Sequence, residues 1–331
     1  MIRWLLMGCW WMWAVPLGAQ AAQACWHEIT PDVLEWRCAN QGLPVSGQSF
    51  ALSVYVVGGA DGLLVLDSGV TASVGRLLGQ QIRARFGVGP WWVLNSQPKP
   101  DHVLGNIGLS EACPECWPGG IEHSVVAGAL TAELMALRCP RCIDNLAKRM
   151  GEASISGTQP VIPKTLLPQL QGDLSLLNAR FAQWRYTVVA NVQTEEAVVL
   201  DHPSQDLVWV GSLVEASDAP DLYDGAVERR IQFLKNLQAR FTANTRLLSS
   251  TGELNRQWVG RNLAYFEELR GSLLQGLKSG ATEVELIGQH AGQPGNGTTT
   301  ANEHRDRTQE IHSLNVQRIL RQLEPLAFES D

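Results

Sequence analysis

The sequence predicts an α/β fold, because short strand-like runs recur with helix-like segments between them. Residues 51–57 alternate in polarity and are rich in β-branched and aromatic side chains, which is typical of a strand. Residues 63–66 form a short apolar run after a glycine-rich turn and predict a second, buried strand. From Thr71, which can cap a helix, apolar residues recur at helical spacing as far as Phe86.

The same alternation of strands and helices continues along the rest of the chain. A strand is expected at residues 90–95, and a polar loop follows over residues 96–105. Later strands are expected at residues 182–190, 197–200, 207–210 and 247–249, and helices at residues 127–136, 225–239 and 257–277. Residues 289–305 are rich in Gly, Asn and Thr. We therefore expect one domain over residues 25–288, a flexible linker over 289–308 and a C-terminal helix over 309–331.

Composition limits the classes of function. A chain of 331 residues with 45% hydrophobic side chains can bury a large core. Its 26 basic and 33 acidic residues give a mildly acidic balance, whereas nucleic-acid binding usually needs a basic face. We therefore expect no nucleic-acid partner.

The first 24 residues predict a signal peptide. Arg3 supplies a positive charge, an apolar run extends from Trp4 to Gly18, and small residues follow at positions 19–24. The run is shorter than the roughly 20 residues that span a bilayer, although an uncleaved membrane anchor remains the alternative. The expected location is the bacterial periplasm or the outside of the cell, with no membrane attachment after cleavage.

Cysteine usage agrees with export. Cys9 leaves with the signal peptide, and an even number of cysteines remains, which predicts disulfides in an oxidising compartment. The candidates are Cys25, Cys38, Cys113, Cys116, Cys139 and Cys142. The simplest pairing joins Cys25 to Cys38 and closes the two CxxC pairs on themselves or on each other. A structural zinc site or a thioredoxin-like role for the CxxC pairs remains an alternative.

The loop over residues 95–106, Asn-Ser-Gln-Pro-Lys-Pro-Asp-His-Val-Leu-Gly-Asn, resembles the His-x-His-x-Asp-His loop of the metallo-β-lactamase superfamily. Four further segments fall in the family's order: residues 66–69 resemble its Asp-x-Gly strand end, and residues 191–197, 210–214 and 248–252 resemble its downstream motifs. The resemblance covers residues 48–275. It implies an αββα sandwich, in which two mixed β-sheets are flanked by helices.

The positions that hold zinc in this family are mostly filled by other residues. In the family one zinc is bound by three histidines and the other by an aspartate and two histidines, with a bridging carboxylate. Asp101 and His102 keep the family's residue types, whereas the remaining positions hold Gln97, Lys99, Gln193, Ser212 and Thr251. Amide and hydroxyl oxygens are poor zinc ligands, and an ammonium group repels a dication and can pair with Asp101 instead. We therefore expect no metal and no other cofactor; zinc would be present only if the assignment of these positions is wrong.

A narrower resemblance points to exported metallohydrolases of quinoprotein relay systems, related to the SoxH-type proteins of sulfur oxidation. It rests on Pro-Asp-Leu-Tyr-Asp-Gly at residues 220–225 and on the helix-like segment at residues 312–324. This resemblance implies a periplasmic redox partner, such as a quinoprotein dehydrogenase or its cytochrome.

Two functions follow from these expectations. The first is a non-catalytic binding or accessory protein. It would bind a small ligand or a periplasmic redox protein in the cleft that holds the metals in the family. The second is a hydrolase with a mononuclear or metal-free site built on Asp101 and His102, since a carboxylate beside a histidine can perform acid–base chemistry. Both residues can equally serve only as supports for their loop. The other histidines are scattered and predict no second metal site.

Overall fold

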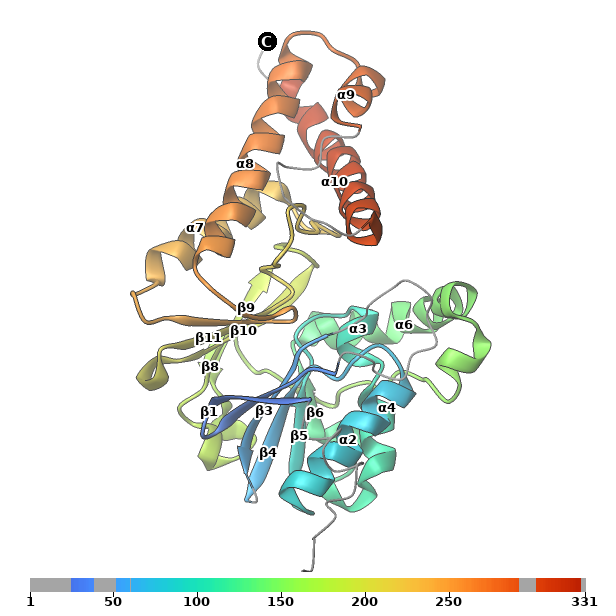
Figure 1. Ribbon diagram of the computed structural model, residues 1–331, viewed down its shortest axis with the longest axis vertical. Coiled ribbons are helices and arrows are strands. Elements are labelled where there is room, and N and C mark those ends of the chain that lie inside the picture. Colours follow the sequence, from blue (N-terminus) through green and yellow to red (C-terminus); the bar gives the residue numbers. More distant parts are fainter. Residues whose placement is uncertain (1–24, 39–51, 60, 292–301, 329–331) are drawn as a thin grey trace, which may run out of the picture.

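The computed structural model describes residues 25–38, 52–59, 61–291 and 302–328. Within them the chain forms two mixed β-sheets that face each other, with helices on the outer face of each (Figure 1). The predicted αββα sandwich is therefore confirmed. The predicted signal peptide, residues 1–24, lies outside the described residues.

The first sheet takes its strands in sequence order. These are β1 (Trp26–Thr30), β2 (Val33–Trp36), β3 (Val54–Gly59), β4 (Gly62–Leu66), β5 (Trp91–Leu94), β6 (Val125–Ala127) and β7 (Thr165–Leu166). Pairing is antiparallel from β1 to β4 and parallel from β4 to β7. As a result the chain leaves β4 and β5 at the same edge of the sheet.

The second sheet has the order β13-β12-β11-β10-β9-β8. Its strands are β8 (Gln171–Asp173), β9 (Arg185–Ala190), β10 (Glu196–His202), β11 (Leu207–Gly211), β12 (Arg246–Ser249) and β13 (Gly252–Leu254). Only the β11–β12 pair is parallel among these described strands. Because β10 and β11 are antiparallel, the start of β10 and the end of β11 lie at one edge.

Helices of the N-terminal half cover the first sheet. They are α2 (Ala72–Phe86), α3 (Pro100–Val103), α4 (Asn106–Ala112), α5 (Ile121–Ser124) and α6 (Ala129–Met150). The Thr71 hydroxyl accepts a hydrogen bond from the Val74 amide at 3.3 Å, so the predicted helix cap is confirmed. Gly105 lets α4 and its preceding loop approach closely, since a Cβ there would lie 1.9 Å from the Ser68 carbonyl oxygen. This contact seats the loop over residues 95–105 beside the end of β4.

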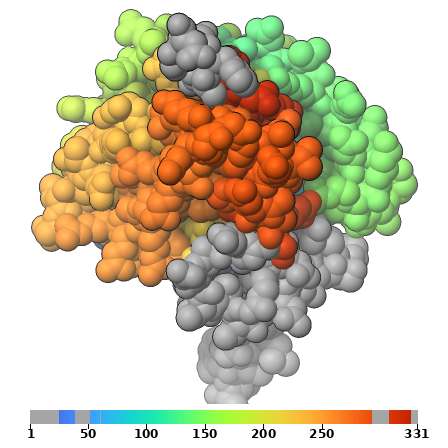
Figure 2. Space-filling view, turned by 90° about the horizontal axis from the view of Figure 1, so that it is seen from above, coloured from blue at the N-terminus to red at the C-terminus, as the bar shows by residue number. Residues whose placement is uncertain are grey.

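The second sheet is covered by α7 (Val227–Arg240), α8 (Gln257–Lys278), α9 (Glu283–His290) and α10 (Asn302–Phe328). Seen from above, the orange and red surfaces of the C-terminal helices form one end of the molecule, beside the green surface of α6 (Figure 2). Helix α9 extends to His290 and α10 begins at Asn302, so helix occupies both ends of the expected linker over residues 289–308. Residues 292–301 of that linker lie outside the described residues.

Three apolar clusters join these layers. Tyr55 and Leu64 of the first sheet pack with Trp209 of the second between the two sheets. A second cluster fills the space between the first sheet and helices α2, α4 and α6. A third cluster fills the space between the second sheet and helices α7, α8 and α10. Short 3₁₀ turns complete the connections at Pro114–Cys116, Glu152–Ile155, Leu174–Leu176, Ala179–Phe181 and Pro203–Gln205.

Some element boundaries differ from the sequence expectation. Helix α6 does not end near residue 136 but continues through Pro140 to Met150, because Cys139, Leu146 and Met150 keep its inner face buried. Strand β9 begins only at Arg185, since residues 182–184 continue the turn that starts at Ala179 and closes with a hydrogen bond from the Trp184 amide to the Phe181 carbonyl oxygen. Across the part of the chain described here, no helix is both long and apolar enough to cross a bilayer.

Candidate functional site

The candidate site lies where strands of both sheets end at the same edge of the sandwich. Loops leave the first sheet after β4 and β5 and leave the second sheet after β11, while the turn before β10 approaches from the same side. The two sheets are tied together here by a hydrogen bond from the Val198 amide to the Ser96 carbonyl oxygen, 2.9 Å long. Residues far apart in sequence therefore meet at this edge.

The hydroxyl of Ser212 is the centre of this meeting point. It lies 3.2 Å from Gln97 Nε2, 3.4 Å from Lys99 Nζ and 3.2 Å from His102 Nε2. It also donates to Gln193 Oε1 at 2.7 Å. All five side chains are buried. Four of the residues that the sequence assigned to former ligand positions thus converge on the fifth, and hydrogen bonds link them.

His102 is held by a carboxylate that the sequence analysis placed in a motif but gave no role. Asp67 follows β4 with a left-handed φ of 64°, and its Oδ2 lies 2.6 Å from His102 Nδ1. The same carboxylate accepts hydrogen bonds from the amide and hydroxyl of Ser96, at 2.8 and 2.9 Å. With Nδ1 bound to Asp67, the Nε2 atom of His102 faces Ser212.

The charges around His102 favour its protonated form. Burial opposes the imidazolium, but Asp67 and Asp101 outweigh burial and raise the pKa of His102. Burial likewise acts to raise the pKa of Asp101, yet Lys99 and His102 lower it overall. Asp101 Oδ2 lies 3.6 Å from His102 Nε2. Asp101 therefore joins the site through His102 and balances the charge of Lys99.

Glu215 extends the network on the side of the second sheet. Gln193 Nε2 donates to Glu215 Oε1 at 3.1 Å and to the Asp221 carbonyl oxygen at 3.0 Å. Burial and the nearby Asp221 raise the pKa of Glu215, although Lys99 and Arg230 act in the opposite direction. Sequence reasoning missed Glu215, because it lies outside the family motifs and only the fold brings it to Gln193.

One wall of the site is the segment between β11 and α7, which α10 fixes in place. Asn315 is fully buried; its side chain accepts from the Leu222 amide at 3.0 Å and donates to the Pro220 carbonyl oxygen at 2.9 Å. Tyr223, in the same segment, places its ring centroid 5.2 Å from Lys99 Nζ. Burial raises the pKa of Tyr223 to about 12, so its phenol stays neutral at physiological pH. Through the hydrogen bonds of Asn315, the C-terminal helix α10 fixes the segment that places Tyr223 beside Lys99.

Thr251 stands apart from this network. Its side chain is linked to Ser249 Oγ at 3.1 Å and to the Ala216 amide at 3.4 Å. No hydrogen bond among the described residues joins it to Ser212. Of the residues predicted for the site, Thr251 is therefore the one that the structure does not bring into the cluster.

The residues present do not fit the pair of zinc ions that the family resemblance implies. Zinc requires about four nitrogen, sulfur or carboxylate ligands. Of the positions that bind zinc in the family, two keep a suitable donor here, the His102 imidazole and the partly exposed Asp101 carboxylate. The groups beside them are two side-chain amides, a hydroxyl and an ammonium. No group of three or more His, Cys, Asp or Glu side chains suited to a metal occurs within the described ranges.

Two of the expected disulfides are confirmed. Cys25 is bonded to Cys38, and Cys113 to Cys116. The expectation for Cys139 and Cys142 is wrong, because both are free thiols within α6. Side chains three residues apart in a helix hold their Cβ atoms about 5–6 Å apart, whereas a disulfide needs about 3.5–4.5 Å. Burial raises the pKa of Cys139 to about 12.

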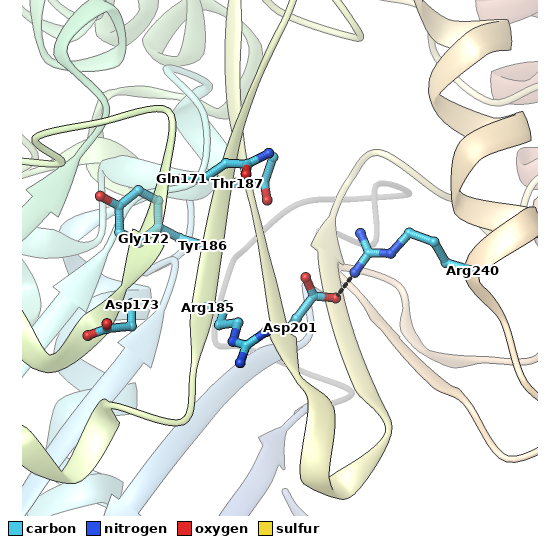
Figure 3. A pocket seen from close by; sticks show the side chains of 8 residues that line it. All are labelled: Gln171, Gly172, Asp173, Arg185, Tyr186, Thr187, Asp201 and Arg240. Atoms are coloured by element: carbon cyan, nitrogen blue, oxygen red, sulfur yellow. Dashed lines mark hydrogen bonds and ion pairs between the residues drawn. The ribbon is translucent and has the colours of Figure 1, made fainter.

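A cavity of about 490 Å³ lies elsewhere, beside β8, β9 and β10 (Figure 3). It is lined by Gln171, Gly172, Asp173, Arg185, Tyr186, Thr187, Asp201 and Arg240. Asp201 and Arg240 form an ion pair across it, and Asp173 accepts from the Ser175 amide at 2.9 Å. None of these lining residues belongs to the cluster around Ser212.

Several solved metallo-β-lactamases resemble this structure. One from Pontibacter korlensis shares 15% identity at a TM-score of 0.53, covering 73% of this chain and 98% of its own. FIM-1 from Pseudomonas aeruginosa, in a mono-zinc form, shares 13% identity over 73% of this chain and 94% of its own, at a TM-score of 0.53. DIM-1 exposed to ceftazidime shares 14% identity over 73% of this chain and 96% of its own, at the same TM-score.

No protein-family model and no curated protein matches the sequence. At such low identities the structural likeness establishes the fold and not the activity. The layers, the order of the strands and these neighbours agree on one conclusion. This chain has the metallo-β-lactamase fold.

Proposed function

We propose that this chain is an exported binding protein that keeps the metallo-β-lactamase fold and has lost its zinc chemistry. The observation that supports this most directly is the position of the Ser212 hydroxyl. Side chains from three other segments of the fold meet at that hydroxyl and fill the place where the family resemblance puts the metals. A buried cluster held together by hydrogen bonds needs no ion to stay folded.

Lys99 is the strongest argument against a retained zinc ion. A dication and an ammonium about 4 Å apart repel each other by on the order of 8 kcal/mol at an effective dielectric constant of about 20. Structural zinc sites gain about 10–16 kcal/mol from binding the ion. The repulsion would therefore remove most of that gain, even before the missing ligands are considered.

The charged side chains near the Ser212 cluster support a small polar ligand rather than an apolar one. Arg138 is paired with Glu195, and Arg318 Nη1 lies 2.8 Å from Asp221 Oδ1. Lys99 contributes a further cation, which faces the ring of Tyr223. Charges of both signs beside the cluster suit a ligand that carries both hydrogen-bond donors and acceptors.

An accessory role beside a quinoprotein dehydrogenase or its cytochrome is the finer form of this proposal. It rests on the resemblance of residues 220–225 and 312–324, two segments that Asn315 joins directly. Surface plasmon resonance with the purified dehydrogenase and cytochrome of the source organism tests it. Saturable binding to either protein supports the role, and no binding up to saturating concentrations contradicts it.

A metal-free hydrolase is the second candidate. The contact between His102 Nε2 and Ser212 Oγ favours it, because a histidine beside a hydroxyl can act as a general base. A mononuclear metal site is less well supported, since Asp101 and His102 supply only two donors, whose atoms Oδ2 and Nε2 lie 3.6 Å apart.

Zinc titration by calorimetry tests the loss of metal chemistry. We expect no stoichiometric binding to the wild-type chain and new binding to the variant that combines Gln97→His, Lys99→His, Gln193→His, Ser212→Asp and Thr251→His. His123→Gln, at an exposed histidine, serves as the control for weak surface binding. Stoichiometric, tight binding to the wild-type chain would overturn the proposal.

A further inference from the structure

We propose that Ser212, His102 and Asp67 form a metal-free nucleophilic triad that accepts a small acyl group from an ester. This inference rests on the zinc-free site proposed above and adds a nucleophile and a substrate class to its second candidate. The three residues come from the ends of β11 and β4 and from α3, so only the fold brings them together.

The geometry meets the requirements for an activated hydroxyl. Ser212 Oγ lies 3.2 Å from His102 Nε2, and His102 Nδ1 lies 2.6 Å from Asp67 Oδ2. A nucleophile within hydrogen-bond reach of a base, and a base oriented by a third group, is the arrangement that activates serine in enzymes of unrelated folds. Asp67 is also fixed by both Ser96 hydrogen bonds, so it is a positioning residue for the imidazole.

Two donors lie where negative charge would develop. Gln97 Nε2 and Lys99 Nζ approach the Ser212 hydroxyl at 3.2 and 3.4 Å. An oxyanion formed at a carbonyl carbon bonded to this oxygen would lie within reach of the same amide and ammonium groups. Preorganised donors of this kind supply much of the transition-state stabilisation in acyl transfer.

The local backbone turns Ser212 toward this cluster. Gly211 ends β11 with a left-handed φ of 54°, and the Leu213 amide closes a tight turn onto the Val210 carbonyl oxygen at 3.0 Å. A Cβ at position 211 would approach Ser96 Oγ at 3.2 Å. Glycine at this position therefore leaves room beside Ser96 and His102.

The tightness of the site defines the substrate class. Ser212 is 4% exposed and His102 is fully buried, so bulky acyl groups cannot reach the hydroxyl without rearrangement. The hydroxyl also has a competing acceptor in Gln193 Oε1 at 2.7 Å and must rotate away from it to react. Short-chain esters such as acetyl esters need the least rearrangement to reach the hydroxyl and are the expected substrates.

The step balances without any cofactor. A lone pair of Ser212 Oγ attacks the ester carbonyl carbon, and the hydroxyl proton passes to His102 Nε2. The bond from that carbon to the alcohol oxygen then breaks, and the proton leaves with the alcohol, which gives acyl-Ser212. Water attacks the acyl carbon and gives its proton to Nε2, and collapse releases the carboxylic acid as the proton returns to Ser212.

Acetylation by p-nitrophenyl acetate tests the triad. The full mature chain is treated with the ester, release of nitrophenol is followed, and peptide mass spectrometry locates the acetyl group. We expect one acetyl group on Ser212, and a loss of rate of about 100-fold or more in Ser212→Ala and His102→Gln. Ser154→Ala removes another buried hydroxyl, one that donates to the Met150 carbonyl oxygen, and should react like wild type.

The pH profile separates a triad from a structural cluster. His102 must be neutral to accept the proton, so acylation should rise with pH through its raised pKa. Asp67→Asn should move this rise to lower pH and slow the plateau rate. Unchanged rates in Ser212→Ala, an acetyl group found on Lys99 or elsewhere instead of Ser212, or no acetylation of folded wild-type protein would each overturn the triad.

Zinc measured on the same samples keeps the two proposals distinct. A zinc-free protein that forms no acetyl-Ser212 would refute the triad and leave the binding role standing. A stoichiometric zinc content, with activity lost on chelation and restored by zinc, would refute both.

Discussion

The ammonium of Lys99 lies 3.4 Å from the hydroxyl of Ser212, at the centre of a buried polar cluster. The Asp67 carboxylate lies behind His102, 2.6 Å from its Nδ1 atom. The side chains of this cluster bind one another through hydrogen bonds. The predictions below follow from these contacts.

Asp67→Asn should destabilise the chain by about 2–4 kcal/mol. Asp67 accepts hydrogen bonds from the Ser96 amide, the Ser96 hydroxyl and His102, and bonds to a charged acceptor contribute about 1.5–3 kcal/mol each. The asparagine side chain keeps one acceptor oxygen, but its NH₂ group then faces hydrogen-bond donors of Ser96 or His102. Urea unfolding measures the effect, with the exposed Asp61→Asn as control; equal stability of both variants would contradict the assigned role.

Stability should depend on pH through His102. Its folded-state pKa is raised above the value of 6.5, so its contribution is complete below pH 6.5 and is lost as pH rises through the folded-state pKa. His102→Gln should therefore flatten the fall in unfolding free energy above pH 6.5, whereas His123→Gln should not. A slope that is the same in wild type and His102→Gln would show that the histidine is not held as an imidazolium.

Asn315→Ala should loosen the wall of the site. The buried amide bonds the Leu222 amide, the Pro220 carbonyl oxygen and the Tyr265 hydroxyl, so its removal leaves buried polar groups without partners. We expect a loss of about 2–4 kcal/mol and faster proteolysis within residues 215–226. Gln309→Ala on the exposed side of α10 is the matched control, and equal digestion of both variants would argue against this coupling.

The mature chain should carry two free thiols. Alkylation of denatured, unreduced protein is expected to label Cys139 and Cys142 and to spare the four bonded cysteines. In the folded protein, Cys142 should react before the buried Cys139, whose high pKa leaves little thiolate at neutral pH. Mass spectrometry of the labelled peptides gives the answer, and a Cys139–Cys142 disulfide would contradict it.

The α/β class and the longer elements could be predicted because those elements show a period, whereas the αββα sandwich followed from the order of the motifs. The spacing of apolar residues located α2, and the capping role of Thr71 followed from the residue type alone. Strands β6, β7, β8 and β13 have only two or three residues each, which is too short for any pattern to be visible. The helix expected at residues 127–136 continues to Met150, because burial of Cys139, Leu146 and Met150 keeps the far half of α6 intact around Pro140.

The candidate site was only partly predictable for a different reason. Motif order identified Gln97, Lys99 and Ser212 as neighbours, but it assigned their roles by reference to absent metal ions. The contact between Ser212 and His102 depends on how the two sheets meet, and no local pattern encodes it. Glu215 and the partnership of Asp67 with His102 are likewise long-range features.

The metal content of the purified mature chain tests the central claim most directly. Protein expressed in zinc-supplemented medium and purified without chelators would be analysed by inductively coupled plasma mass spectrometry, beside a variant that combines Gln97→His, Lys99→His, Gln193→His, Ser212→Asp and Thr251→His. We predict far less than one zinc ion per wild-type chain and a clear gain in the variant. About two zinc ions per wild-type chain would contradict the account.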